Sequence, residues 1–166
     1  MCRDGFGRKE FGIRIARVIR KQGWICHACC HMQTHYNLVL TVEENALQPG
    51  MQRLNGGYAQ NFNRRWERSG HLRGDRYAAK PVESDGHFLS CFRYIARNPV
   101  RDGLGASAAD WPWSSYPDCI GLESRFGFVT HDAVRAYFGS DSSRAVELMR
   151  DFVEDIERGS VPRRAA

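Results

Sequence analysis

Residues 26–40 read CHACCHMQTHYNLVL, and the interpretation of this stretch decides the fold. It holds three of the six histidines and three of the six cysteines of the chain. The apolar and β-branched content of residues 24–31 and 35–42 is typical of two strands, and the three residues between them suit a hairpin turn. We therefore predict a β-hairpin whose second strand begins with polar side chains.

The rest of the chain predicts helices packed around this hairpin. Apolar residues recur at helical spacing in residues 7–22, which end at Gly23, and in residues 47–66. Ser84 is a predicted N-cap for the next helix, and Asn98-Pro99 is predicted to stop it. An aromatic turn at residues 110–116 and helices at about 131–138 and 142–158 complete one mixed α/β domain.

Length and composition agree with a single globular domain. The chain has 166 residues, of which 42% are hydrophobic and 26% are charged. No apolar run is long enough to cross a membrane, and residues 1–12 lack the apolar core of a secretory signal. The cytoplasm is the predicted location, with no membrane partner. Cysteines there stay reduced, which favours metal binding, catalysis or packing over disulfides.

Positive charge is concentrated in residues 53–80. This segment holds seven basic residues against two acidic ones, and the net charge of the whole chain is +5. Aromatic residues such as Tyr58, Trp66 and Tyr77 alternate with the arginines. Cations that meet phosphates and rings that stack on bases are typical of single-strand nucleic-acid binding. The alternative is a solvated basic helix and loop.

Two metal sites are conceivable in the opening stretch. Cys26 and Cys29 have the spacing of half a structural zinc site, but Cys91 and Cys119 stand alone, and no second pair follows. On a strand, His35 and Asn37 would point to one face with Cα atoms about 6.5–7 Å apart. They could thus serve one ion, although a strand histidine without a metal is the commoner case.

Four segments in order resemble a known family: CHACCHMQTHYNLVL, MQRLNGGYAQNFNRRWERSGHLRGDRY, FRYIARNPVRDGL and DWPWSSYPDCIG. Together they resemble the single-tyrosine HUH transposases, of the insertion-sequence and REP-associated type, over about residues 20–120. The resemblance implies a ferredoxin-like antiparallel sheet backed by helices, with residues 1–125 as the nuclease domain and 126–166 as a helical extension of it. It also implies metal-dependent cleavage and rejoining of single-stranded DNA through a 5′-phosphotyrosine.

The resemblance also assigns residues. Tyr94 matches the nucleophile, while His35, Asn37 and Asn98 match the ligands of a Mg²⁺ or Mn²⁺ ion. Tyr94 and Asn98 are four apart and would share one helix face. The expected partner is single-stranded DNA, with hairpin ends and a second copy of the chain left open as partners. The residues expected to bind nucleic acid are Arg64, Arg65, Arg68, Arg73, Arg76, Tyr77, Arg93 and Arg97.

The sequence departs from the family pattern in two places. Asn37 stands where the family has the second histidine of the pair. A carboxamide oxygen suits Mg²⁺ but binds borderline metals less well than imidazole, so we expect weak metal binding and leave open a catalytically degenerate, nucleic-acid-binding descendant. The family's first strand also has no counterpart before the first helix, which would leave a sheet edge open unless another segment or a subunit covers it.

Overall fold

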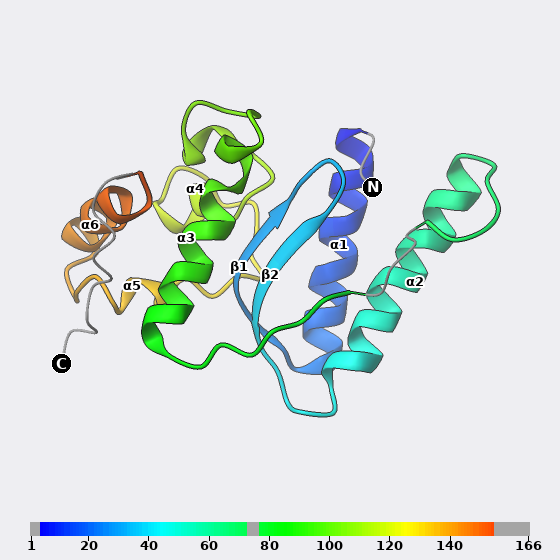
Figure 1. The fold of residues 1–166 in the computed structure, drawn as a ribbon, viewed down its shortest axis with the longest axis horizontal. Helices are drawn as coiled ribbons and strands as arrows, with labels where there is room; N and C mark the ends of the chain where they lie inside the picture. Colours follow the sequence, from blue (N-terminus) through cyan, green and yellow to red (C-terminus); the bar gives the residue numbers. More distant parts are fainter. Residues whose placement is uncertain (1–3, 73–76, 155–166) are drawn as a thin grey trace.

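The computed structural model describes residues 4–72 and 77–154. A β-hairpin lies between one helix on one face and two helices on the other (Figure 1). The mixed α/β class is confirmed. The central elements are α1 (Gly5–Gln22), β1 (Ile25–His31), β2 (Tyr36–Thr41), α2 (Leu47–Arg65) and α3 (Asp85–Arg101).

The hairpin is antiparallel, with His31 opposite Tyr36 and Ile25 opposite Thr41. A bulge between Cys26 and Ala28 shifts the register. Because of the bulge, Cys26 and Cys29 belong to the same face. The predicted hairpin is confirmed, and its turn closes with the Met32 amide donating to the His35 carbonyl at 2.9 Å.

The alternation of β2 divides the core in two. Val39 packs with Leu89 and Phe92 of α3, whereas Leu38 packs with Phe11 of α1 and Leu54 of α2. Each face of the hairpin is thus covered by helices. Residues of β2 with odd numbers face α3.

Capping residues fix where α1 and α3 begin and end. The Asp4 side chain accepts a hydrogen bond from the Gly7 amide, and Gly23 ends α1 in the left-handed region with φ 66°. Ser84 caps α3 by accepting from the His87 amide. The predictions of Gly23 and Ser84 as caps are confirmed.

The predicted stop at Asn98-Pro99 is wrong. Pro99 lies inside α3, which continues to Arg101. Asn98 and Pro99 are both buried, and the last turn closes with the Asp102 amide donating to the Asn98 carbonyl at 3.1 Å. Tertiary packing thus offsets the proline, which has no amide to donate to the Ile95 carbonyl one turn earlier.

Two later segments cover the outer edge of β1. The Ser115 amide donates to the Cys29 carbonyl at 2.9 Å, and the Ser115 hydroxyl accepts from the Cys29 amide at 3.0 Å. The His31 amide donates to the Trp113 carbonyl, and the Thr130 amide donates to the Cys26 carbonyl. In the described residues the sheet therefore has two strands, extended by isolated bridges at Ser114 and Val129. The edge that the sequence left open is filled from within the chain.

The C-terminal elements pack against α3. Tyr116 is buried in the core of α3, together with Val134, Met149 and Val153. The helix expected at 131–138 is a single turn, and the one expected at 142–158 is described as far as Glu154, with residues 155–158 outside the described part. The elements are η1 (Ala108–Asp110), α4 (Tyr116–Cys119), α5 (Asp132–Arg135) and α6 (Ser142–Glu154).

Candidate functional site

The side chains of His35 and Asn98 meet between the hairpin turn and α3. The distance from Asn98 Nδ2 to His35 Nε2 is 3.1 Å, and Asn98 is 4% exposed. The other ring nitrogen of His35, Nδ1, lies 3.2 Å from the Thr34 hydroxyl. In this arrangement the Asn98 amide donates to an unprotonated Nε2, so the tautomer with the proton on Nδ1 is the one that fits.

Asn37 lies two positions after His35, on the face of β2 that meets α3. Its amide nitrogen is buried, and it has no hydrogen-bond partner in residues 4–72 and 77–154. A buried amide without a partner is costly in a site that serves packing alone. Asn37 is thus suited to receive a ligand from outside the chain.

Tyr94 is one turn before Asn98 on α3 and therefore shares its face. Its side chain is 48% exposed, whereas its neighbours Ile95 and Ala96 on the helix are buried. The Arg101 guanidinium lies 5.0 Å from the centre of the Tyr94 ring. The structure therefore brings His35 into contact with Asn98 and places Arg101 beside Tyr94, with Tyr94 and Asn98 one turn apart on α3.

Arg93 and Arg97 are directed to the C-terminal helix. The Arg93 guanidinium lies 5.4 Å from the ring centre of Phe152, and Arg97 Nη1 donates to the carbonyls of Val153 and Glu154, each at 2.9 Å. Arg97 satisfies carbonyls at the end of α6, a structural task. Binding of nucleic acid by these two arginines stays a prediction.

The basic residues after α2 have different surroundings. Arg65 donates to both carboxylate oxygens of Asp4, at 3.3 and 2.8 Å, and its guanidinium lies over the rings of Phe6 and Trp66. Arg64 and Arg68 are exposed. Tyr77 is half-buried against the α1–α2 side of the core. Arg73 and Arg76 lie outside the described residues.

The cysteines of β1 are packing residues in this geometry. Cys26 and Cys29 are both fully buried, and burial raises the pKa of the Cys29 thiol well above its ordinary value. Zinc binds thiolates, so a raised pKa opposes it. In the part of the chain that the structure describes, no three His, Cys, Asp or Glu side chains gather to hold a metal. The geometry gives the zinc alternative no support.

A divalent ion at His35 would depend on neutral ligands. The imidazole nitrogen and the amide of Asn98 are in contact, and Asn37 adds a buried amide on the same face. Their chemistry fits Mg²⁺ or Mn²⁺, provided that the Asn98 amide turns its oxygen toward the site. With no carboxylate in the set, these residues alone would hold such an ion weakly.

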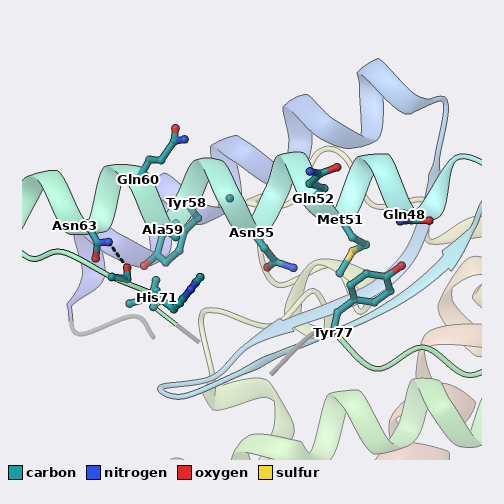
Figure 2. Close-up of a pocket in the computed structure, with 13 residues that line it drawn as sticks. Gln48, Met51, Gln52, Asn55, Tyr58, Ala59, Gln60, Asn63, His71 and Tyr77 are labelled. Carbon is teal, nitrogen blue, oxygen red and sulfur yellow. Dashed lines mark hydrogen bonds between the residues drawn. The ribbon is translucent and has the colours of Figure 1, made fainter. Parts of the chain in front are cut away.

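Sequence analysis missed a groove beside α2. It has a volume of about 830 Å³ and lies between α2 and the segment that contains His71 and Tyr77 (Figure 2). Its polar lining comes from Gln48, Gln52, Asn55 and Asn63, which share one helix face. The signal was available as carboxamides at helical spacing, but polar residues on a helix usually indicate only a solvated face.

Comparisons with known proteins found no match. No protein-family model matches the sequence, and no curated protein or solved structure matches it either. Within residues 4–72 and 77–154, none of the helices has the length and apolar character needed to span a membrane.

Proposed function

We propose that the protein binds single-stranded DNA and cleaves and rejoins it through a covalent link to Tyr94, as the single-tyrosine HUH transposases do. The contact between His35 and Asn98 carries the proposal. The resemblance assigned both residues to one site, although they belong to different elements. A shared site requires that they be neighbours, and they are in hydrogen-bond contact.

The position of Tyr94 supports the same function. A nucleophile must reach its substrate, and the half-exposed phenol lies on the helix face that ends at Asn98. The Arg101 guanidinium beside the ring adds a positive charge where a phosphate would approach. Tyr94 is thus accessible, oriented by α3 and accompanied by a cation.

The proposed reaction exchanges one phosphodiester bond for another. The Tyr94 oxygen attacks phosphorus and loses its proton to water, the bond from phosphorus to the 3′-oxygen breaks, and the departing oxygen takes up a proton. The products are a 5′-phosphotyrosine and a free 3′-hydroxyl. Attack by a 3′-hydroxyl on the phosphotyrosine reverses the exchange and rejoins the strand without ATP. A divalent ion supplies charge neutralisation at the phosphate when bound.

His35, Asn37 and Asn98 have holding roles in this scheme. The hydrogen bond between Asn98 Nδ2 and His35 Nε2 holds the ring against α3, and this bond would have to open for Nε2 to bind an ion. Asn37 presents its amide from the neighbouring strand position. The groups of the site are neutral, so the negative charge of the DNA meets no repulsion there.

Asn37 favours a second candidate function, binding without cleavage. A carboxamide in place of the family's histidine weakens the metal site, and a chain that had lost catalysis could keep its basic and aromatic surface. Both functions predict salt-dependent binding of single strands. They differ in whether a covalent product forms.

The experiment is an incubation of the protein with single-stranded DNA pools carrying a label on the 3′ end, with Mg²⁺, with Mn²⁺ and with chelator. The proposal expects a labelled protein band that survives denaturing electrophoresis and requires the metal. Binding without such a band, with cleavage appearing in Asn37→His, would establish the second candidate. Failure to bind single strands at about 0.15 M salt, where several phosphate contacts still register, would remove both.

A further inference from the structure

The groove beside α2 has walls of two kinds. One wall is the α2 face with Gln48, Asn55 and Asn63, and the other includes His71 and Tyr77. Figure 2 shows the Asn55 side chain and the Tyr77 ring on the side of α2 that faces the groove. The volume of about 830 Å³ is in the range of small-molecule sites.

The charge of the α2 wall restricts the ligand. From residue 47 to residue 63 the helix holds one charged side chain, Arg53, which does not line the groove. Carboxamides donate and accept hydrogen bonds equally well and carry no charge. A ligand matched to this wall is neutral and displays donors and acceptors side by side.

Asn55 is held in place for such a contact. Its carbonyl oxygen accepts a hydrogen bond from the Tyr36 hydroxyl at 2.9 Å, which fixes the amide and leaves its NH₂ group to donate. Asn63 is fixed in the opposite sense, because its NH₂ group donates to the Gly70 carbonyl at 2.7 Å and its oxygen is left to accept. The wall thus offers one oriented donor and one oriented acceptor.

A nucleobase has the required properties. It is planar and uncharged, and its edge carries donors and acceptors, which the remaining donor of Asn55 or the remaining acceptor of Asn63 can contact. Its faces stack on aromatic side chains, for which the rings of Tyr77 and His71 are suited.

The ends of the groove have the charge that a nucleic-acid backbone needs. Arg64 follows Asn63 directly, and Arg68 is exposed in the turn after α2. Figure 1 shows this end of α2 at the same end of the molecule as the hairpin turn and the C-terminal end of α3. A strand leaving the groove there would run toward His35, and Tyr36 already joins β2 to the groove through Asn55.

We infer that the groove between α2 and the side chains of His71 and Tyr77 binds unstacked bases of single-stranded nucleic acid. The Asn55 and Asn63 amides contact the base edges, and Tyr77 stacks on a base face. The choice of ligand rests on the proposed function. The proposed function concerns the phosphates of the strand, and the groove would add contacts to its bases. The groove holds the strand while the His35–Asn98 site acts on a phosphate.

The test is fluorescence anisotropy in chelator, with a labelled oligodeoxyadenylate and an abasic strand of equal length and charge. Wild type is expected to bind the oligodeoxyadenylate about tenfold more tightly than the abasic strand, because stacking of bases on aromatic side chains adds binding free energy. Tyr77→Ala and Gln48→Ala are expected to remove most of that preference and leave the abasic strand unaffected. Gln48 is exposed, so its truncation does not disturb the core.

Two controls separate base contacts from other effects. Ser90→Ala changes an exposed polar side chain on α3, which does not line the groove, and is expected to leave both affinities unchanged. Arg64→Gln removes a cation and is expected to weaken both strands equally. Equal binding of the two strands by wild type would overturn the inference, and so would an undiminished preference in both groove variants. A groove that binds peptides would give equal binding of the two strands.

The inference and the proposed function fail separately. Base preference is measured without metal and with Tyr94 intact, whereas adduct formation requires both metal and Tyr94. A groove that discriminates bases in a protein without an adduct would keep the inference and remove the nuclease. An adduct in a protein that binds both strands equally would keep the proposed function and remove the inference.

Discussion

His35 and Asn98 lie 63 residues apart in the chain, and their side chains meet at 3.1 Å. The contact joins the hairpin turn to the buried end of α3, one turn beyond the exposed phenol of Tyr94. The hydrogen bond holds the His35 ring in one orientation against α3.

Asn37→His is expected to strengthen metal binding. The substitution puts an imidazole nitrogen in place of a carboxamide on the face of β2 that meets α3, and nitrogen ligands favour Mn²⁺ over oxygen amides. We expect a gain in Mn²⁺ affinity on the order of tenfold, measured by isothermal titration calorimetry. Asn37→Ala is the matched control and should bind Mn²⁺ no better than wild type. Equal affinity in wild type and Asn37→His would place the metal elsewhere.

His31 is expected to make stability depend on pH. It is fully buried between Phe11 and Phe126, and burial lowers its pKa from 6.5 to about 4, with a smaller effect from the nearby charge of Arg8. The unfolded chain takes up a proton near pH 6.5 but the folded one only near pH 4, so stability is complete above pH 6.5 and falls as the pH drops toward 4.

The expected loss from His31 alone between pH 7 and pH 5 is about 2 kcal/mol in the free energy of unfolding. Urea denaturation at both pH values measures it. His31→Phe keeps the aromatic contacts and should remove that part of the slope, whereas His71→Gln, at an exposed position, should not. A slope that persists unchanged in His31→Phe would mean that other groups cause it.

The fold was predictable where its signals are local. Gly23 and Ser84 end and begin helices because one residue suffices to cap a terminus, and the hairpin follows from strand content with a short break. The persistence of α3 beyond Pro99 was not predictable, because burial of Asn98 and Pro99 overrides a backbone preference. The segment that pairs with the outer edge of β1 was also not predictable. Cys29 and Ser115 are 86 residues apart in the chain, and no periodicity connects them.

The site was partly predictable for a similar reason. Tyr94 and Asn98 share a helix face by spacing alone, and the resemblance supplied His35 as their neighbour. The groove was not predicted, because Gln48, Asn55 and Asn63 fit equally well on a helix face that is exposed to solvent. Contacts such as that of Arg97 with the end of α6 depend on how elements pack, which spacing does not specify.

Ser115→Ala is expected to weaken the covered edge of the sheet. The substitution removes the hydroxyl that accepts from the Cys29 amide and leaves a buried donor with one partner fewer. The expected cost is about 1–2 kcal/mol in the free energy of unfolding, read from the urea midpoint. Ser90→Ala is the control, because the Ser90 hydroxyl is exposed on α3 and donates only within its own helix. Similar small effects in both variants would show that Ser115 does not hold the edge.

The most direct measurement is the site of covalent attachment to DNA. The protein is incubated with single-stranded DNA and Mg²⁺ or Mn²⁺, digested with nuclease and protease, and searched by mass spectrometry for a peptide bearing a nucleotide 5′-phosphate. Tyr94→Phe is compared with Tyr137→Phe, whose hydroxyl donates to Asp85 away from the site. The account predicts the nucleotide on Tyr94, its loss in Tyr94→Phe and its survival in Tyr137→Phe. A nucleotide on another residue, or an adduct that persists in Tyr94→Phe, would contradict it.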